Sequence, residues 1–397
     1  MNQNIEPPKE ALAGLKVIEL GQLIAGPFAA KTLADFGADV IKIENSRSGD
    51  PLRRWRMLRN GTSVWWEVQS RNKRSVCVDL RSEEGQSNIR TLVREADVLI
   101  ENFKPGMLES WGLGWQDLHA INPRLIMLRI SGYGQTGPDK NKPGFGVLGE
   151  AMGGLRHLTG EPGRVPVRVG VSIGDSLAAL HGVIGILMAL NHRHNNGGIG
   201  QFIDVALYES VFNVMESLLP EYDAFDAIRG RAGSALPGIA PSNAYPCANG
   251  DYVLIGGNGD SIYKRLMNAI GRSDLGNDPA FTHNDGRARE VEKLDHAIGA
   301  WTMERSVDEV IEKLDAVNVP VGRVYTIEDI VKSPQYQARD MILNTTTAEG
   351  EALAVPGFVP KLSATPGQLR TPAPTLGQHT SECLNQVGWP ARVPESE

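Results

Sequence analysis

The amino-acid sequence predicts an α/β fold with two domains, a large one built on a parallel sheet and a smaller α/β domain after it. Its 397 residues exceed what a single hydrophobic core usually supports. In the first half of the chain, short apolar segments rich in β-branched residues alternate with segments of helical character. A stretch rich in Gly, Pro and small side chains at 229–241 then has the composition of a linker.

The first segments of the chain form a predicted βαβ unit. Residues 16–20 and 39–44 are short and apolar, and the helix predicted at 27–36 between them carries Pro27 in its first turn. Further strands are predicted at 75–80, 97–101, 125–130 and 201–207, with a helix at 82–96. This alternation favours a Rossmann-like parallel sheet that is covered on both faces and binds ligands at the carboxyl ends of its strands.

Longer helical segments follow, and we expect helices at 146–158, 176–191 and 208–222. The segment 176–191 is apolar on nearly every face, so it should be buried in the domain or under a partner subunit. We assign residues 1–228 to the large domain, completed by 333–397, and residues 229–332 to the small domain. The small domain is predicted to hold a strand at 252–255 and helices near 261–270, 290–303 and 307–316.

Charge is distributed unevenly along the chain. The formal net charge of −7 argues against nucleic acid as a partner, because nucleic-acid-binding domains are strongly basic. Between residues 47 and 81, however, nine Lys and Arg side chains stand against three acidic ones. An acidic protein with one basic segment suits a small anionic ligand, although a solvated surface loop would give the same count.

Composition also indicates the compartment. Cys77, Cys247 and Cys383 are too widely spaced for a disulfide framework or a zinc site, and no metal site is expected. The apolar run at 183–190 is too short to cross a bilayer, and the polar start of the sequence lacks the apolar core of a signal peptide. We therefore expect a cytoplasmic protein with no membrane partner.

A nucleotide is a plausible ligand for such a sheet, and a NAD(P)-dependent oxidoreductase is one alternative. Glu44, at the end of the second strand, stands where a dinucleotide-binding fold places its ribose-binding acid. The loop 21–26 is not a Gly-x-Gly-x-x-Gly fingerprint, and Pro27 and Phe28 stand where a P-loop needs Lys and Ser or Thr. The dinucleotide signature is thus incomplete.

Asp175 is the most informative single residue, because it is a lone carboxylate between a glycine turn and a long apolar helix. Aspartate is among the best residues for capping the free N–H groups at a helix start. A carboxylate in that place could also be a nucleophile. The segment by itself leaves both interpretations open.

The ordered motifs of the whole chain resemble the family III CoA-transferases, the family that includes formyl-CoA transferase and the carnitine CoA-transferases. The motifs that carry the resemblance are LKVIEL at 15–20, AGP at 25–27, FGADVIKIE at 36–44, GD at 49–50, RNKRS at 71–75, ENFKPG at 101–106, GYGQTGP at 132–138, GD at 174–175, GQ at 200–201 and LGQHT at 376–380. None is decisive alone, but the complete set in this order is specific.

The resemblance implies a nucleophilic role for Asp175. In the family, this aspartate attacks an acyl-CoA to form a mixed anhydride, and the released CoA thiolate then gives an aspartyl-CoA thioester. An acceptor carboxylic acid repeats the steps in reverse. The segment Gly256, Gly257, Asn258 and Gly259 resembles the family's glycine loop, which closes over the aspartyl intermediate, although Asn258 departs from the all-glycine form. With the loop in the small domain, the resemblance implies an active site between domains or subunits.

The resemblance also implies a CoA site on the large domain, with CoA as the acyl-CoA substrate and no permanently bound cofactor. The implied contacts are Ile24, Arg47, Val78, Arg81, Asn102, Phe103, Met107 and Trp111. Arg81 stands where formyl-CoA transferase has a pyrophosphate-binding Lys, and Ile24 where it has a Gln. Asn45 replaces a family arginine, so Arg47 is expected to supply that phosphate contact. Val78, Met107 and Trp111 could equally be core residues.

Two further rival functions stay open beside CoA transfer and the NAD(P)-dependent oxidoreductase. An α-methylacyl-CoA racemase of the same fold would place a His near Phe145, which cannot move a proton; His181, in the apolar helix, is expected to be structural, as is His379. A non-catalytic CoA-binding protein is the other rival. The resemblance further implies an interlocked homodimer, and Arg168, seven residues before Asp175, favours a dicarboxylic acid as the small carboxylic acid partner.

Overall fold

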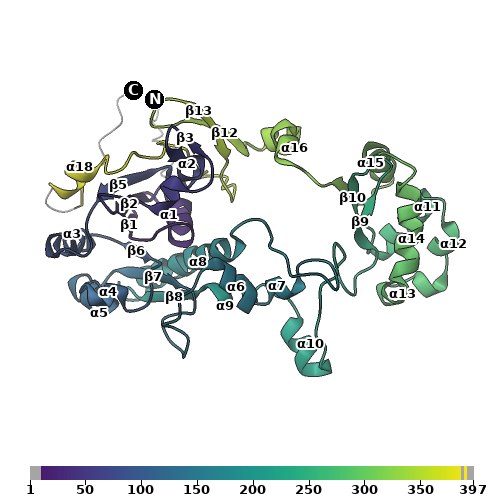
Figure 1. The fold of residues 1–397 in the computed structure, drawn as a ribbon, viewed down its shortest axis with the longest axis horizontal. Coiled ribbons are helices and arrows are strands. Elements are labelled where there is room, and N and C mark those ends of the chain that lie inside the picture. Colours follow the sequence, from purple (N-terminus) through teal and green to yellow (C-terminus); the bar gives the residue numbers. More distant parts are fainter. Residues whose placement is uncertain (1–9, 386–388, 391–397) are drawn as a thin grey trace, which may run out of the picture. The chain divides into compact units, whose positions relative to one another are not determined.

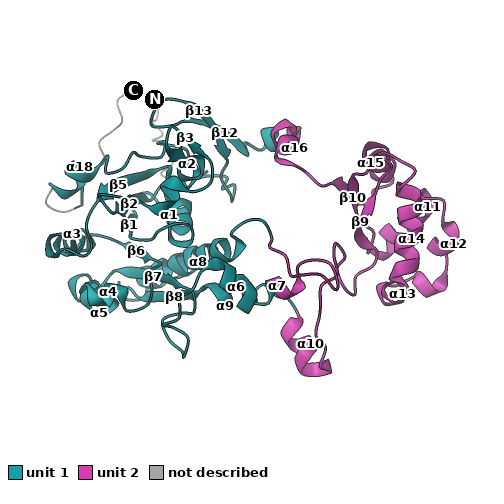
Figure 2. Cartoon of the chain, in the orientation of Figure 1, with its two compact units in different colours: residues 1–155, 169–216, 335–397 teal, residues 156–168, 217–334 magenta. Residues whose placement is uncertain are grey.

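The computed structural model describes residues 10–385, 389 and 390, and the chain divides into two compact units (Figure 2). The first unit comprises residues 1–155, 169–216 and 335–397, and the second comprises 156–168 and 217–334. The second unit therefore begins at residue 217 rather than at the predicted 229, and it also takes in the segment 156–168.

A six-stranded, fully parallel sheet forms the centre of the first unit (Figure 1). Its strands are β1 (Lys16–Glu19), β2 (Asp39–Glu44), β5 (Lys73–Cys77), β6 (Val98–Glu101), β7 (Ile126–Ser131) and β8 (Phe202–Ala206). They lie in the order β5-β2-β1-β6-β7-β8, so the predicted parallel α/β sheet is confirmed. The order reverses between β1 and β6, and this is where doubly wound sheets bind their ligands.

Helices cover both faces of the sheet, so its central strands are buried on both sides. One face is covered by α1 (Ala25–Asp35) and α8 (Ile173–Asn195), and the other by α3 (Glu83–Val93) and α5 (Trp115–Ile121). Neighbouring residues of one strand enter opposite cores: Val17 packs with α1 and α8, whereas Ile18 packs with α3 and α5.

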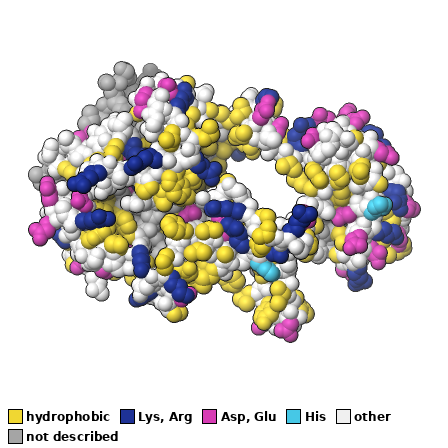
Figure 3. All heavy atoms as spheres, viewed as in Figure 1, with side chains coloured by type: hydrophobic (Ala, Val, Ile, Leu, Met, Phe, Trp, Pro, Cys, Tyr) yellow, Lys and Arg dark blue, Asp and Glu magenta, His cyan; other side chains and the backbone are white. Residues whose placement is uncertain are grey.

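Helix α8 is longer than predicted, because it starts at Ile173 rather than at Ser176 and runs to Asn195. By length and composition it could cross a membrane, but one side of it packs on the sheet through residues such as Ala179 and Ile186. Its outer side leaves four large apolar side chains exposed, which are Leu180 (44%), Ile184 (49%), Leu187 (44%) and Met188 (66%). Figure 3 shows that apolar side chains are numerous on the surface of the first unit.

Two helices that the sequence predicts as continuous are in fact broken. The segment 146–158 forms α6 (Gly146–Met152) and α7 (Leu155–Leu158), separated at Gly153 and Gly154, and Gly154 has a φ of +96°. The segment 208–222 forms α9 (Leu207–Phe212) and α10 (Leu218–Phe225), with Glu216 between them in the left-handed region. Both predictions of a single helix were wrong because these positions leave the helical φ region.

The remaining elements of the first unit are the 3-10 turn Pro51–Arg54, β3 (Leu58–Arg59), β4 (Thr62–Ser63), α2 (Val64–Ser70), α4 (Met107–Ser110), the hairpin of β12 (Ile342–Thr346) and β13 (Ala352–Pro356), and α18 (Thr380–Leu384). Of these, α18 packs against the edge strand β5. The segment before α18 runs along β5, where the His379 N–H donates to Ser75 O at 2.9 Å. The late part of the chain thus groups with the first unit.

The second unit has its own antiparallel sheet, in the order β11-β10-β9, with helices packed on it. Its elements are α10, β9 (Ser242–Pro246), β10 (Tyr252–Gly256), α11 (Asp260–Ala269), α12 (Ser273–Gly276), the 3-10 turn Pro279–Phe281, α13 (Asn284–Arg289), α14 (Val291–Thr302), α15 (Val307–Asp315), β11 (Val321–Arg323) and α16 (Ile327–Lys332). The next helix, α17 (Pro334–Ala338), belongs to the first unit from residue 335 onward. Tyr245, Leu266, Ile298 and Leu314 lie in its core. The sequence predicted β10 and the three longer helices but not the two flanking strands.

Candidate active site

A pocket of about 320 Å³ opens at the carboxyl ends of the strands in the first unit. The segments that follow β1, β2, β5 and β6 line it, together with α4. Its lining residues are Leu20, Gln22, Ile43, Glu44, Asn45, Val78, Asp79, Leu80, Arg81, Phe103, Met107 and Trp111. Five of the eight residues expected at the CoA site, which are Val78, Arg81, Phe103, Met107 and Trp111, therefore meet in one cavity.

One wall of this pocket is apolar. The rings of Phe103 and Trp111 pack edge to face with their centroids 5.6 Å apart, and Val78 is buried beside them. Met107 leaves 39% of its side chain exposed at the rim. Arg81 is exposed at the same pocket, so a cation and an apolar wall face a common space. That combination suits a ligand with both phosphate groups and an apolar arm.

Asn102 does not line the pocket but shapes the loop that does. Its Oδ1 accepts the Gln22 N–H at 2.7 Å, and its Nδ2 donates to Gln22 O at 2.9 Å. A Cβ added at Gly21 would lie 3.2 Å from Asn102 Oδ1, so the loop after β1 folds closely around this amide. Asn102 thereby joins the carboxyl ends of β1 and β6 at the point where the strand order reverses.

Two of the expected CoA contacts lie away from the pocket lining. Ile24 is buried just before α1, where its carbonyl accepts a hydrogen bond from Gln69 Nε2 at 3.1 Å. Arg47 is exposed on a turn in which its N–H donates to Asn45 Oδ1 at 2.9 Å. Asn45 stands at the position of the family arginine, and its side chain holds this turn by accepting that hydrogen bond.

A buried ion-pair network under the loop after β1 was missed by the sequence reasoning. Lys42 Nζ lies 2.7 Å from Glu19 Oε1, 2.8 Å from Asp50 Oδ2 and 2.9 Å from Gly21 O. Burial opposes the charge of Lys42, but Asp50 and Glu19 outweigh it and raise the pKa of the ammonium. Asp50 also accepts the N–H of Leu23, whose φ is +63°. The sequence signal was a charged residue inside each of two strands whose neighbours are apolar.

Glu44 is engaged in a way that excludes the ribose-binding role. Its carboxylate accepts hydrogen bonds from Arg53 Nε at 2.8 Å and Arg53 Nη2 at 2.9 Å, and from the Asp50 N–H at 2.9 Å. Ser75 Oγ donates to it as well, at 2.5 Å. Burial disfavours the anion, but the Arg53 hydrogen bonds keep the pKa of Glu44 below its usual range. Both oxygens are occupied, so the structure argues against a dinucleotide site.

Asp175 lies in the first turn of α8, and the cap interpretation is wrong because the helix begins three residues earlier than a cap at Asp175 would require. The N-cap residue is Ser172, which makes Asp175 the third helical residue. Its half-buried carboxylate rests against Gly146 at the start of α6: a Cβ added at residue 146 would lie 2.1 Å from Asp175 Oδ2. The fit of Gly146 to this carboxylate was also missed by sequence reasoning.

The start of α8 lies at the same edge of the sheet as the pocket. Because α8 leads back to the parallel strand β8, its N-terminus is at the carboxyl ends of the strands. The chain that leaves β7 returns close to its end, since a Cβ added at Gly132 would lie 2.8 Å from the Cα of Gly144. Asp175 and the pocket thus occupy the ligand-binding edge of the first unit.

The glycine loop belongs to the second unit and follows β10 directly. The Gly256 N–H donates to Pro320 O and the Gly257 N–H donates to Pro241 O, each at 2.9 Å. A Cβ added at Gly257 would lie 2.5 Å from Leu266 Cδ2, so close packing requires this glycine. Gly259 is the N-cap residue of α11. The loop therefore has a defined, hydrogen-bonded shape.

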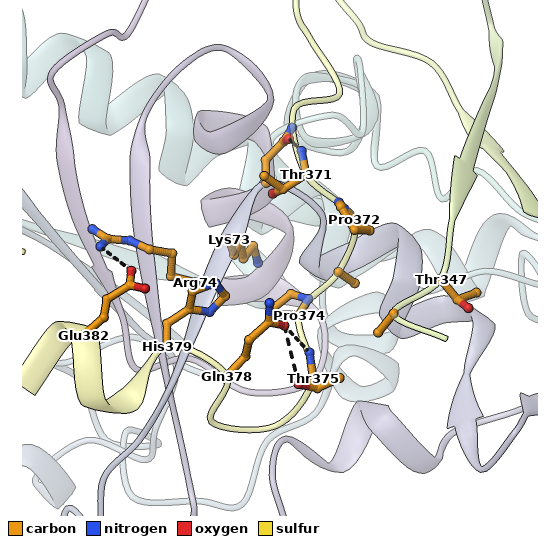
Figure 4. Close-up of a pocket in the computed structure, with 13 residues that line it drawn as sticks. Lys73, Arg74, Thr347, Thr371, Pro372, Pro374, Thr375, Gln378, His379 and Glu382 are labelled. Carbon is orange, nitrogen blue, oxygen red and sulfur yellow. Dashed lines mark hydrogen bonds and ion pairs between the residues drawn. The ribbon is translucent and has the colours of Figure 1, made fainter. Parts of the chain in front are cut away.

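A second cavity of the first unit, of about 550 Å³, lies between β5 and the segment 371–382 (Figure 4). Its charged groups are already paired: Arg74 contacts Asp39 at 2.6 Å and Glu382 at 3.2 Å. His379 Nδ1 accepts the Ser75 N–H at 3.1 Å, which fits the structural role expected for this histidine. None of the predicted site residues lines this cavity.

His181, the histidine nearest to Asp175 in sequence, does not offer a free ring nitrogen as a proton partner. His181 Nδ1 contacts Leu177 O at 2.9 Å and His181 Nε2 contacts Asn213 Oδ1 at 3.1 Å, so both ring nitrogens have partners. Phe145 is 65% exposed at the start of α6. Within residues 10–385, 389 and 390, no three His, Cys, Asp or Glu side chains come together as a metal site.

The first unit thus combines a doubly wound sheet, a pocket with a cation and an apolar wall, and an aspartate at the ligand edge, and comparison with known proteins gives the class of enzyme. Residues 12–380 match the model of CoA-transferase family III, and the protein belongs to this family. It is an enzyme of the CoA-transferase class, because its close relatives carry that activity in their names.

The relatives are similar over nearly their whole length. Succinyl-CoA--D-citramalate CoA-transferase of Chloroflexus aurantiacus is 46% identical over 96% of this chain and 94% of its own. Succinate--glutarate CoA-transferase of Agrobacterium fabrum is 34% identical over 97% of this chain and 96% of its own. A CAIB/BAIF family protein from Brucella suis shares the fold with a TM-score of 0.82 and 35% identity, covering 94% of this chain and 98% of that one.

Proposed function

We propose that the protein moves CoA from succinyl-CoA to a small dicarboxylic acid, with Asp175 as the nucleophile. The observation that carries this proposal is the seat of Asp175, a half-buried carboxylate in the first turn of α8 at the ligand edge of the sheet. Relatives whose names specify succinyl-CoA with citramalate, malate or glutarate support the substrate class.

The reaction needs only the Asp175 carboxylate as nucleophile: CoA passes from the succinyl group to the aspartyl group, and from there to the acceptor acid. An Asp175 oxygen attacks the succinyl thioester carbonyl and expels CoA thiolate, which leaves a mixed anhydride. The thiolate attacks the aspartyl carbonyl, releasing succinate and forming the aspartyl-CoA thioester. The acceptor carboxylate then displaces the thiolate, and the thiolate attacks the acceptor carbonyl of the new anhydride. The new acyl-CoA leaves, and Asp175 is regenerated as a carboxylate.

Features of the fold are suited to stabilise the Asp175 carboxylate, the CoA phosphates and the reaction intermediates of this cycle. The partial positive charge at the start of α8 stabilises the ionised carboxylate before attack. We propose that the CoA nucleotide occupies the 320 Å³ pocket, with its phosphates near Arg81 and its apolar arm along Phe103 and Trp111. The glycine loop would cover the aspartyl carbonyl and exclude water, which would otherwise hydrolyse both intermediates.

The assembly is also part of the proposal. The apolar stripe of Leu180, Ile184, Leu187 and Met188 on the outer side of α8 is suited to burial against a second copy of the chain. We propose a homodimer, interlocked as in the family resemblance, that acts in the cytoplasm. Arg168 is exposed and belongs to the second unit, and we keep it as a candidate contact for the acceptor's second carboxylate.

A transfer assay with trapping of the intermediate tests the nucleophile. The enzyme is incubated with succinyl-CoA and one of several acids, including citramalate, malate and glutarate, and the CoA esters are separated by chromatography. Hydroxylamine should convert Asp175 of the wild-type enzyme to a hydroxamate, visible as a mass change on its peptide, only when succinyl-CoA is present. Asp175→Ala should lose transfer by at least about a thousandfold and give no hydroxamate.

Two controls complete this test. Asp223→Ala changes an exposed aspartate of α10 and should keep full transfer. Transfer by Asp175→Ala at the wild-type rate would refute the covalent mechanism. Deuterium exchange at the α-carbon of a 2-methylacyl-CoA, without an acceptor acid, would instead favour the racemase.

A further inference from the structure

We propose that Arg129 is a positioning residue for CoA binding, because it holds both ends of the segment 103–111 that forms the apolar wall of the 320 Å³ pocket. This inference rests on the proposed function, in which CoA occupies this pocket, and it concerns a charged cluster to which the family resemblance assigns no role. Arg129 lies on β7, near the carboxyl end of the strand, and is 6% exposed.

The segment 103–111 needs support from the rest of the unit. Four of its residues form the short helix α4, and a helix of a single turn has little stability of its own. Phe103, Met107 and Trp111 line the pocket, and Phe103 packs edge to face on Trp111 across the two ends of the segment. The apolar wall therefore keeps its shape only if both ends are held in place.

Glu101 holds the first end. It stands directly opposite Arg129 in the parallel pairing of β6 with β7 and is 1% exposed. Its Oε1 accepts a hydrogen bond from Arg129 Nε at 2.8 Å, and its Oε2 accepts the Phe103 N–H at 2.7 Å. Burial raises the pKa of Glu101 to about 7, although the charge of Arg129 opposes the rise. Above that pH the ionised carboxylate joins Arg129 to the start of the segment.

Arg129 holds the other end directly, through Glu109 of α4. Its Nη1 lies 2.8 Å from Glu109 Oε1, and its Nη2 donates to Glu109 Oε2 at 3.2 Å. One guanidinium thus bonds two carboxylates with all three of its nitrogens. The single nitrogen of a lysine cannot form this two-point contact with Glu109 and also bond Glu101.

The cluster of Glu101, Glu109 and Arg129 lies on the face of the sheet away from α8. Leu128 and Ile130, the neighbours of Arg129 on β7, enter the core that contains α8, so the alternation of the strand turns Arg129 to the opposite face. Asp175 belongs to α8. The cluster should therefore affect the binding of CoA without changing the chemistry at the aspartate.

The test compares Arg129→Lys with wild type in the full-length enzyme at about pH 8, where Glu101 is ionised. Titration calorimetry should show a Kd for CoA about tenfold higher, and the KM for succinyl-CoA should rise equally, with kcat within about twofold. Adenosine 3′,5′-bisphosphate lacks the pantetheine arm of CoA. Its Kd should change less than about threefold, because its phosphates would contact Arg81 and not the apolar wall.

Arg193→Lys is the matched control for a buried arginine. Arg193 also bonds a carboxylate and lies in the first unit, since it donates to Asp97 Oδ1 at 2.6 Å and to Arg124 O at 2.8 Å. These partners do not line the pocket. We expect Arg193→Lys to lower the melting temperature but to leave the Kd for CoA, the KM and kcat within about twofold of wild type.

A second pair of variants decides the question if Arg129→Lys folds poorly. Glu109→Ala frees the far end of the segment and leaves the buried pair of Arg129 with Glu101 intact, so it should fold. Its Kd for CoA should rise about three- to tenfold. Glu95→Ala removes a carboxylate of similar exposure, 46% against 44% for Glu109, whose partner is Lys16 at 2.8 Å, and should leave the Kd unchanged.

The outcomes separate the two proposals. A wild-type enzyme that neither binds nor transfers CoA overturns the proposed function, and the role of the cluster falls with it. A wild-type enzyme that transfers CoA, beside folded Arg129→Lys and Glu109→Ala variants with an unchanged Kd for CoA, overturns the role of Arg129 alone. An equal loss of affinity for CoA and for the bisphosphate would overturn it too, since the whole pocket and not its apolar wall would then be disturbed.

Discussion

The carboxylate of Asp175 and the Cα of Gly146 are in direct contact, so the space that a side chain at 146 would need is filled by the proposed nucleophile. A Cβ on residue 146 would lie 2.1 Å from Oδ2 and 2.9 Å from Cγ of Asp175. Gly146 is also the first residue of α6. The start of one helix thereby sets the position of a side chain in the first turn of another.

Gly146→Ala should displace the Asp175 carboxylate and lower kcat by about 100-fold, because a shift of about 1 Å is enough to lose near-attack geometry. The KM for succinyl-CoA should change little. Steady-state kinetics at saturating acid measures both values. Gly299→Ala, at a helical glycine of α14 with nothing within 4 Å of the added Cβ, is the matched control and should retain wild-type kcat. Normal turnover by Gly146→Ala would place the reacting atom elsewhere.

Asn102→Ala should raise the KM for the CoA ester by about tenfold, since it removes both hydrogen bonds that hold Gln22 at the pocket. Asn122→Ala offers a close control. Its amide donates to Val93 O and Ala96 O, each at 2.8 Å, on segments that do not line the pocket. Both variants should lower the melting temperature, but only Asn102→Ala should weaken binding of CoA in titration calorimetry.

Glu67→Gln should stabilise the protein at about pH 8 but not near pH 4. Burial, together with the nearby charge of Glu349, raises the pKa of Glu67 to about 7. Its Oε2 is buried without a hydrogen-bond partner in the described structure. The folded protein therefore keeps a proton that the unfolded chain, with a pKa of 4.5, releases, so the free energy of unfolding falls as pH rises from about 4.5 to about 7.

Urea unfolding at the two pH values measures this effect. We expect a gain of about 1–2 kcal/mol for Glu67→Gln at pH 8, less than the full pKa difference would give, because solvent near the site screens the charge. A variant with the same pH dependence as wild type would show that Glu67 is not the responsible group.

The double substitution Ile184→Glu with Met188→Glu should weaken the proposed dimer. It places two carboxylates on the exposed apolar stripe of α8, where burial against a second copy would leave them unpaired. Sedimentation velocity should show a larger monomer fraction at micromolar concentration. Met303→Glu, at an exposed methionine beyond α14, should leave the sedimentation pattern unchanged. A monomeric wild-type enzyme would contradict the assembly.

Much of the large domain could be predicted from sequence because its elements follow simple periodicity. The strand 39–44 is buried along nearly its whole length, and its apolar residues Val40, Ile41 and Ile43 were enough to mark it, so that β2 matches its predicted range residue for residue. The predictions failed where single residues change the backbone direction, as at Gly154 and Glu216. They also missed β9, whose sequence Ser-Asn-Ala-Tyr-Pro has no alternating pattern and is held by pairing with β10.

The same distinction separates the site residues that the sequence predicted from those that it missed. Residues next to strand ends, such as Val78 and Phe103, reach the pocket because parallel strands share one ligand edge. Pairings between side chains and partners on separate segments had no local signature: Glu44 with Arg53, Asp50 with Lys42, and Arg287 with Asn258 O. Sequence spacing alone does not tell which oxygen each of these cations contacts.

Because Glu44 is bound to Arg53, the topology of this sheet does not by itself determine which nucleotide the pocket can bind. The strand order is the one that dinucleotide-binding proteins use, yet the acid at the end of β2 is neutralised by Arg53 and closed off by the Asp50 N–H. The phosphate groups of a ligand near Arg81 would therefore lie near the neutralised Glu44–Arg53 ion pair and would not be repelled by a free carboxylate. Redesigning the pocket for a dinucleotide would require releasing Glu44 from Arg53 first, and a glycine fingerprint introduced into the loop after β1 would not suffice.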